Sequence, residues 1–109
     1  MTHPIGFYAA RPQGHPDHEI LTKLEAKFGS YFQQLSTIEL CTLMTYCSLE
    51  VEGHYRNLNP GHECVMLQED FWEITLSLKI ILSLVSVLTH ETRLDLMPFL
   101  CEQIRNRPR

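Results

Sequence analysis

Hydrophobic positions recur at helical spacing along most of the chain. From Asp17 onward, apolar residues return every three or four positions: Ile20, Leu24, Phe28, Tyr31 and Leu35. This spacing places them on one face of an amphipathic helix, and the acids Asp17 and Glu19 suit the positive end of a helix dipole. The pattern therefore predicts a first helix from Asp17 to about Gln34.

A capping motif predicts the start of a second helix. The stretch STIE at positions 36–39 matches the capping box, in which the serine hydroxyl and the glutamate carboxylate each satisfy an unpaired backbone N–H. A wide apolar face follows, made of Leu40, Cys41, Leu43, Met44, Cys47 and Val51. We expect this helix to run to about Arg56, because Asn-Pro-Gly at positions 59–61 then breaks the backbone.

A third helix is predicted from about Cys64 to His90. Its second half is apolar around most of its circumference and leaves one polar stripe, made of Thr75, Lys79, Ser83, Ser86 and His90. A helix that is apolar nearly all round is surrounded by protein. Either the stripe reaches solvent, or Lys79 has an acidic partner such as Glu39 or Glu50, because an unpaired charge is costly in a core.

Prolines shape both ends of the chain. Three X-Pro steps in residues 1–16 force the residue before each proline out of the helical region, so we expect an extended arm there. Part of the arm should lie against the body, with Ile5 and Phe7 on one side if it forms a short strand. Near the other end, Pro98 is best tolerated in the first turn of a helix. We therefore predict a turn at 90–93 and a fourth helix with Asp95 as its N-cap.

These elements together predict an all-α fold. Residues 17–109 should form a single-domain antiparallel bundle of about four helices, preceded by the extended arm of residues 1–16. A chain of 109 residues holds one core and hardly two, and its 44% hydrophobic and 20% charged residues are ordinary for a folded protein.

Charge and composition exclude several classes of function. A net charge of -4 has the wrong sign for wrapping a phosphate backbone, which argues against nucleic-acid binding. The N-terminus is broken by proline and glycine and shows no secretory signal, which predicts a cytoplasmic protein. The apolar stretch 74–88 contains Lys79 and is shorter than the roughly 20 residues of a membrane span. The four cysteines, Cys41, Cys47, Cys64 and Cys101, are expected to be reduced and mostly buried.

One segment contains candidate metal ligands. His54, His62 and Cys64 lie close together in the sequence, and Glu50 lies one turn before His54 on the same face of the second helix. These four side chains could converge as a zinc site, although their spacing matches no standard motif. The alternative is that the histidines are turn residues beside Pro-Gly and that Cys64 packs into the core.

The sequence gives little support for a catalytic, nucleotide-binding or reactive-thiol site. The cluster at positions 15–19, HPDHE, could suggest acid–base work, but adjacent residues at a helix start point apart, and helix capping explains it. Phosphate-binding loops are absent, so no nucleotide and no other cofactor is expected. Cys64, beside His62 and near a helix N-terminus, is the one thiol with a reason to be reactive.

The leading hypothesis is a non-catalytic protein-binding module, of the adaptor, inhibitor or antitoxin/immunity-like kind, that acts through an acidic helical surface. One alternative is a metal- or redox-responsive sensor that uses His54, His62 and Cys64. Another is a small nucleic-acid-binding regulator that uses the arginine-rich tail, residues 105–109. The apolar second half of the third helix further predicts a homodimer, because three short helices offer too little surface to cover it.

Overall fold

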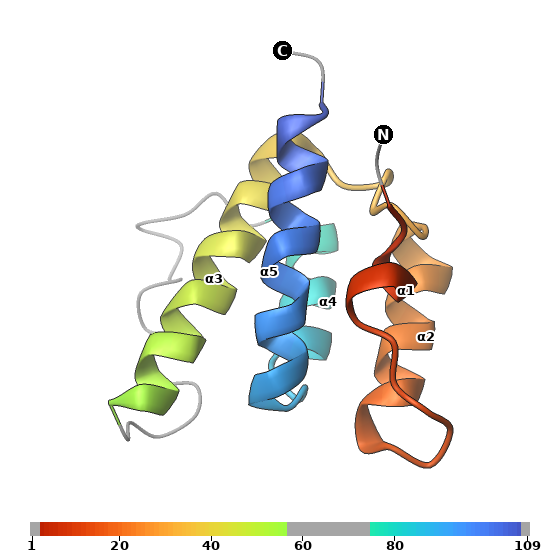
Figure 1. Cartoon of the computed structure of the whole chain (residues 1–109). Helices are drawn as coiled ribbons and strands as arrows, with labels where there is room; N and C mark the ends of the chain where they lie inside the picture. The colour runs from red at the N-terminus through yellow and green to blue at the C-terminus, as the bar shows by residue number, and fades with distance from the viewer. Residues whose placement is uncertain (1–2, 57–74, 108–109) are drawn as a thin grey trace.

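Five helices make up the regular structure of residues 3–56 and 75–107, which are the residues that the computed structural model describes (Figure 1). The helices are α1 (Ile5–Tyr8), α2 (Pro16–Phe28), α3 (Thr37–Tyr55), α4 (Leu76–Val85) and α5 (His90–Arg105). The described residues contain no strand, so the all-α prediction is confirmed. None of these helices is both long and apolar enough to pass through a membrane.

The long helices α3 and α5 form the centre of the fold. They lie side by side and run in opposite directions, with α4 packed against α3 and α2, and α1 against α5 (Figure 1). Each helix contributes to one buried apolar cluster, for example through Ile5, Leu24, Leu43, Ile81 and Leu96. Burying one such side chain contributes about 1.5 to 3 kcal/mol, so this shared core holds the described helices together as one unit.

The capping box of the second predicted helix is confirmed. The Ser36 hydroxyl accepts from the Glu39 backbone N–H at 3.1 Å, and the Glu39 carboxylate accepts from the Ser36 N–H at 2.8 Å. The same carboxylate also accepts from the Thr75 hydroxyl, and Thr75 is the N-cap of α4. Burial raises the pKa of Glu39, but these hydrogen bonds outweigh burial and leave the pKa below its usual value. One glutamate therefore fixes the starts of two helices.

The first predicted helix is shorter than its apolar spacing suggested. It ends at Phe28 instead of near Gln34, because Gly29 adopts a φ of 91° and reverses the backbone. The segment after Gly29 is a turn whose apolar side chains still reach the core. Phe32 is fully buried, and its ring lies edge-on to that of Phe99 at 5.0 Å. Apolar spacing alone could not distinguish this turn from two more turns of helix.

The N-terminal arm was expected to be extended throughout. It contains instead the single helical turn α1. Its Ile5 is buried while Phe7 is 63% exposed, so the predicted strand with both residues on one side is wrong. The Ile5 backbone N–H donates to the Ser30 carbonyl at 2.7 Å. This hydrogen bond ties the arm to the turn that follows α2.

The predicted third helix is helical from Leu76 to Val85, as expected, but it is interrupted at Thr75 and ends before His90. Thr75 has extended dihedral angles and caps α4, and α4 ends at Val85. The turn that follows α4 ends before His90, where α5 begins. The prediction of a turn at residues 90–93 is therefore wrong, because these residues are helical. The part of the prediction that falls on residues 57–74 lies outside the described residues. Lys79 is exposed, so its polar stripe reaches solvent.

The last helix starts earlier than predicted. Its N-cap is Thr89 and not Asp95, and Pro98 stands inside it, on an exposed face. Proline removes one backbone hydrogen bond there. The burial of Leu96, Phe99 and Leu100 on the same helix offsets that loss, so the rule that places proline in a first turn is overridden by packing.

The cysteines divide into two environments. Cys47 is fully buried, and burial raises the pKa of its thiol to about 12. Cys41 and Cys101 are exposed, so the prediction that the thiols are mostly buried is wrong for these two. All three are free thiols, and Cys64 lies outside the described residues.

Candidate functional site

Two of the four predicted metal ligands lie on the last two turns of α3. Glu50 is buried, with 4% of its surface exposed, whereas His54 is exposed. His62 and Cys64 lie outside the described residues. The structure therefore places half of the predicted set on one helix and leaves the convergence of all four a prediction.

The structure brings a residue to His54 that the sequence did not suggest. The imidazole of His90, the first residue of α5, stacks on that of His54 with ring centroids 3.8 Å apart and an interplanar angle of 12°. Tyr55 stands edge-on to both rings, at 5.4 Å from His54 and 5.1 Å from His90. We call these three side chains the His54–Tyr55–His90 patch. It forms where the end of α3 meets the start of α5.

The sequence held one signal for this patch. His90 was noticed as the last residue of the polar stripe on the predicted third helix. A helix from 64 to 90, however, assigns His90 to the end of that helix and not to the start of α5. Because α5 begins at His90 and runs antiparallel to α3, its first residue lies beside the last residues of α3. Only the correct helix boundary reveals this neighbour.

The electrostatic surroundings favour a neutral His90. Burial lowers the pKa of His90, and the nearby charges of His54 and Arg93 lower it further, while Glu91 acts in the opposite direction. The positive end of the α5 dipole also disfavours a cation at this first helical position. Both effects favour the neutral form of the His90 ring.

Stacked imidazoles do not by themselves form a metal centre. The nitrogen lone pairs lie in the ring planes, so in two nearly parallel rings they do not converge on one ion as tetrahedral zinc requires. Within residues 3–56 and 75–107, no three His, Cys, Asp or Glu side chains are grouped so as to hold a metal ion. Metal analysis of untagged protein tests the full predicted set.

Arg93, in the first turn of α5, connects this helix to the end of α4. It is buried, and its guanidinium donates to the carbonyls of Val85 and Ser86 at 3.3 and 3.2 Å. These carbonyls belong to the end of α4, where a cation opposes the helix dipole. The positions of α4 and of the first turn of α5 are thus linked through one side chain.

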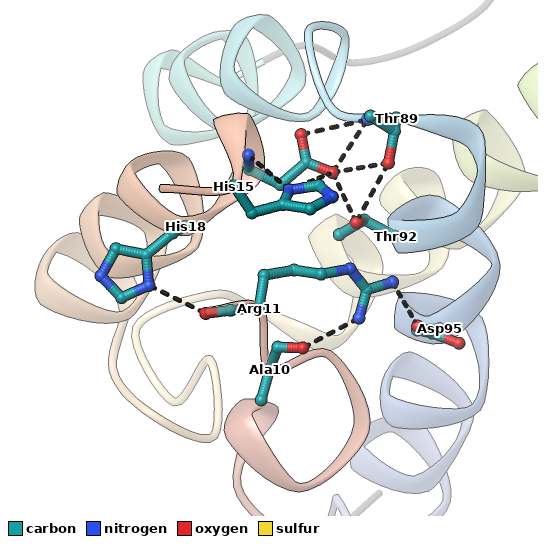
Figure 2. A network of polar contacts seen from close by, with 8 residues as sticks. Ala10, Arg11, His15, His18, Thr89, Thr92 and Asp95 are labelled. Carbon is teal, nitrogen blue, oxygen red and sulfur yellow. Dashed lines mark hydrogen bonds and ion pairs between the residues drawn. The ribbon is translucent and has the colours of Figure 1, made fainter. Parts of the chain in front are cut away.

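A second polar network fixes the start of α5 against the start of α2 (Figure 2). The Asp17 carboxylate, 1% exposed, accepts from the Thr89 N–H at 3.1 Å and from the hydroxyls of Thr89 and Thr92 at 2.6 and 2.5 Å. Thr89 is the N-cap of α5, so a residue of α2 caps α5. Burial raises the pKa of Asp17, but these hydrogen bonds outweigh burial and the pKa is lowered.

The histidines of the HPDHE cluster have structural contacts (Figure 2). His15 is the N-cap of α2, and its Nδ1 accepts from the Asp17 N–H at 3.1 Å. His18 bonds the Arg11 carbonyl at 2.9 Å, and the Arg11 guanidinium pairs with Asp95 at 2.6 Å. The capping interpretation of this cluster is confirmed.

The arginine tail is partly engaged in the fold. Arg107 donates to the carbonyls of Leu35 and Phe32 at 2.6 and 2.8 Å, which fastens the chain after α5 to the turn after α2. Arg105 is exposed, and the last arginine lies outside the described residues. Arg107 is therefore a structural residue.

Comparisons of the chain with known protein families, with curated proteins and with solved structures find no match.

Proposed function

We propose that the protein is a non-catalytic binding module for another protein, and that the His54–Tyr55–His90 patch is the centre of its contact surface. The observation that carries this proposal is the exposure of Tyr55, 70%, beside two other aromatic rings. The aromatic residues Phe32, Tyr46 and Phe99, in contrast, are buried. An exposed aromatic cluster is typical of the residues that dominate binding energy at protein interfaces.

The surroundings of the patch support the same proposal. Leu94 lies one turn after His90 on α5 and is 37% exposed, which extends the apolar area along that helix. Charged side chains border it, with the exposed Glu52–Arg56 ion pair at 2.9 Å at the end of α3 and the exposed Glu91 on α5. An apolar centre with a charged rim matches the anatomy of protein interfaces. Glu91 favours a partner that carries a cationic side chain beside an apolar one.

The test uses two matched tyrosine variants. Tyr31 is also exposed, at 38%, but it lies in the connection before α3, away from the patch. We expect a partner captured from the native source by the wild-type protein to be lost with Tyr55→Ser and kept with Tyr31→Ser. With the purified partner, Tyr55→Ser should raise the Kd by about tenfold or more, as expected for an aromatic residue at an interface centre.

Two results would overturn the proposal. Equal affinities of both variants for the purified partner would place the contact elsewhere on the molecule. A partner bound by the Tyr55→Ser and His90→Gln variants as tightly as by the wild-type protein would remove the patch from the interface. Circular dichroism spectra of each variant confirm that the helices are intact.

We also propose self-association through α4, the described part of the apolar segment that predicted a dimer. Leu76 and Ile80 lie one turn apart on this helix and are 75% and 37% exposed. A second copy could cover them in a two-fold interface, the commonest arrangement of soluble oligomers. Light scattering during size-exclusion chromatography should give about twice 12.7 kDa, and Leu76→Asp should return the mass to that of the monomer. A monomeric wild-type mass across a wide concentration range would exclude this dimer.

A further inference from the structure

A surface cleft lies at the other end of α5, between its last turns and α1. Its volume is about 550 Å³, and its lining includes Tyr8, Pro98, Cys101, Glu102 and Arg105. Sites for small molecules usually measure about 300 to 1,000 Å³ and combine apolar walls with a few polar groups. The cleft has both features, with the rings of Tyr8 and Pro98 next to charged side chains.

Hydrogen bonds hold one wall of the cleft in place. The Glu102 carboxylate accepts from the Tyr8 hydroxyl, from the His3 backbone N–H at 2.6 Å and from the His3 Nδ1 at 3.1 Å. On the same helix, the Gln103 amide donates to the His3 carbonyl at 3.3 Å. Because two residues of the arm are bonded to two residues of α5, the cleft is formed before any ligand arrives, which lowers the entropic cost of binding.

The same bonds lower the pKa of Glu102, so its carboxylate is ionised, and they direct its charge toward the arm. Glu102 has only 15% of its side chain exposed, and its oxygens face donors from the arm. The hydrogen bond to Glu102 raises the pKa of Tyr8, so the phenol stays neutral at physiological pH and adds no second anion. The carboxylate is directed toward the arm, and the phenol carries no charge.

Arg105 supplies the opposite charge. It is exposed in the last turn of α5, and it makes no hydrogen bond or ion pair with the described part of the chain. Arg105 and Tyr8 line the same cleft, so the guanidinium and the phenol both face a ligand bound there. A guanidinium presents its N–H donors in a planar fork that matches the two oxygens of a carboxylate.

We propose that this cleft binds a small molecule with a carboxylate, anchored by Arg105, whose apolar part lies against Tyr8 and Pro98. A carboxylate suits the site better than a phosphate, because a doubly charged group would be repelled by Glu102 and one arginine would not neutralise it. The site is separate from the His54–Tyr55–His90 patch, which lies at the start of α5. Its ligand is therefore an addition to the proposed protein-binding function.

Cys101 provides a direct probe of the cleft, and Cys41 a control. Both thiols are exposed, but only Cys101 lines the cleft. Iodoacetate carries a carboxylate, whereas iodoacetamide is neutral and of nearly the same size. Alkylation rates at each cysteine, read by peptide mass spectrometry, give the ratio of iodoacetate to iodoacetamide reactivity. We expect this ratio to be roughly threefold or more higher at Cys101 than at Cys41, and to fall with added salt.

Variants of Arg105 identify the origin of this preference. Arg105→Gln should lower the Cys101 ratio to that of Cys41, and Arg105→Lys should keep most of it, because the charge remains. Equal ratios at the two cysteines in the wild-type protein would overturn the proposal. A high ratio that survives Arg105→Gln would overturn it as well.

Ligand protection gives a second readout. Benzoate and benzamide share a flat ring and differ in charge, so benzoate should slow the reaction of Cys101 with iodoacetamide and benzamide should not. Cys41 should react at the same rate with both. Protection of Cys101 by both compounds alike, or by neither at millimolar concentration, would contradict a carboxylate site.

Discussion

Replacing Asp17 with Asn isolates the charge of the carboxylate that caps α5 from α2. The amide keeps the shape of the side chain and one oxygen that can accept from Thr89 and Thr92. It converts hydrogen bonds to a charged acceptor, worth about 1.5 to 3 kcal/mol, into neutral ones worth about 0.5 to 1.5 kcal/mol. Several bonds share this acceptor and are not additive, so we expect a loss of about 2 kcal/mol in the free energy of unfolding at pH 7. This is a large fraction of the roughly 5 to 15 kcal/mol that stabilises a domain.

The pH dependence of that loss follows from the lowered pKa of Asp17. A carboxyl whose folded pKa lies below its unfolded value of about 3.9 stabilises the fold above that value and loses its effect as pH falls through the folded pKa. Urea unfolding at pH 7, 5 and 3 should therefore show a constant difference between wild type and Asp17→Asn at the two higher values. The difference should shrink at pH 3.

Glu19→Gln is the matched control. Glu19 lies in the same first turn of α2, but it is exposed and pairs only with Lys23, at 3.5 Å. Its replacement should change stability by less than about 0.5 kcal/mol. A loss below about 0.5 kcal/mol for Asp17→Asn would refute the capping role. So would a difference from wild type that is the same at pH 3 and pH 7.

Three further outcomes are expected from other features. Alkylation of the native protein, read by peptide mass spectrometry, should modify Cys41 and Cys101 quickly and Cys47 only on unfolding, since Cys47 is buried with a pKa of about 12; rapid labelling of Cys47 would contradict its burial. Pro98→Ala should raise the melting temperature, because alanine restores a backbone N–H inside α5, where proline costs about 3 kcal/mol. A lower melting temperature would show that the proline ring is needed for packing. Gly29→Ala should destabilise by about 1 kcal/mol or more in urea unfolding, because a φ of 91° strains any side chain, and an unchanged midpoint would contradict that geometry.

Local signals in the sequence were enough to predict α3. Its capping box and its last turn are where the sequence places them, because both depend on contacts within a few residues. The class of fold followed in the same way from repeated helical spacing. The end of α2 was missed because apolar residues after Gly29 keep helical spacing while they pack from a turn.

Long-range contacts explain the remaining differences. The start of α5 depends on Asp17, which is 72 residues away from Thr89, and no local pattern reveals such a partner. The His54–His90 contact of the candidate site was hidden for the same reason, since it needs both the correct helix start and the antiparallel packing of α3 and α5. Glu50 and His54 were identified as neighbours because they share one helix.

Several contacts join parts of this chain that are synthesised far apart in time, and this affects the order in which the protein can fold. His3 is separated from Glu102 by 99 residues, and Arg107 from Leu35 by 72. Helical proteins usually fold through local contacts and therefore fold fast, whereas distant contacts raise contact order and slow folding. While the ribosome is still making α5, the arm and α2 lack the residues that hold them. The early part of the polypeptide must therefore wait for its last helix before it reaches its native position.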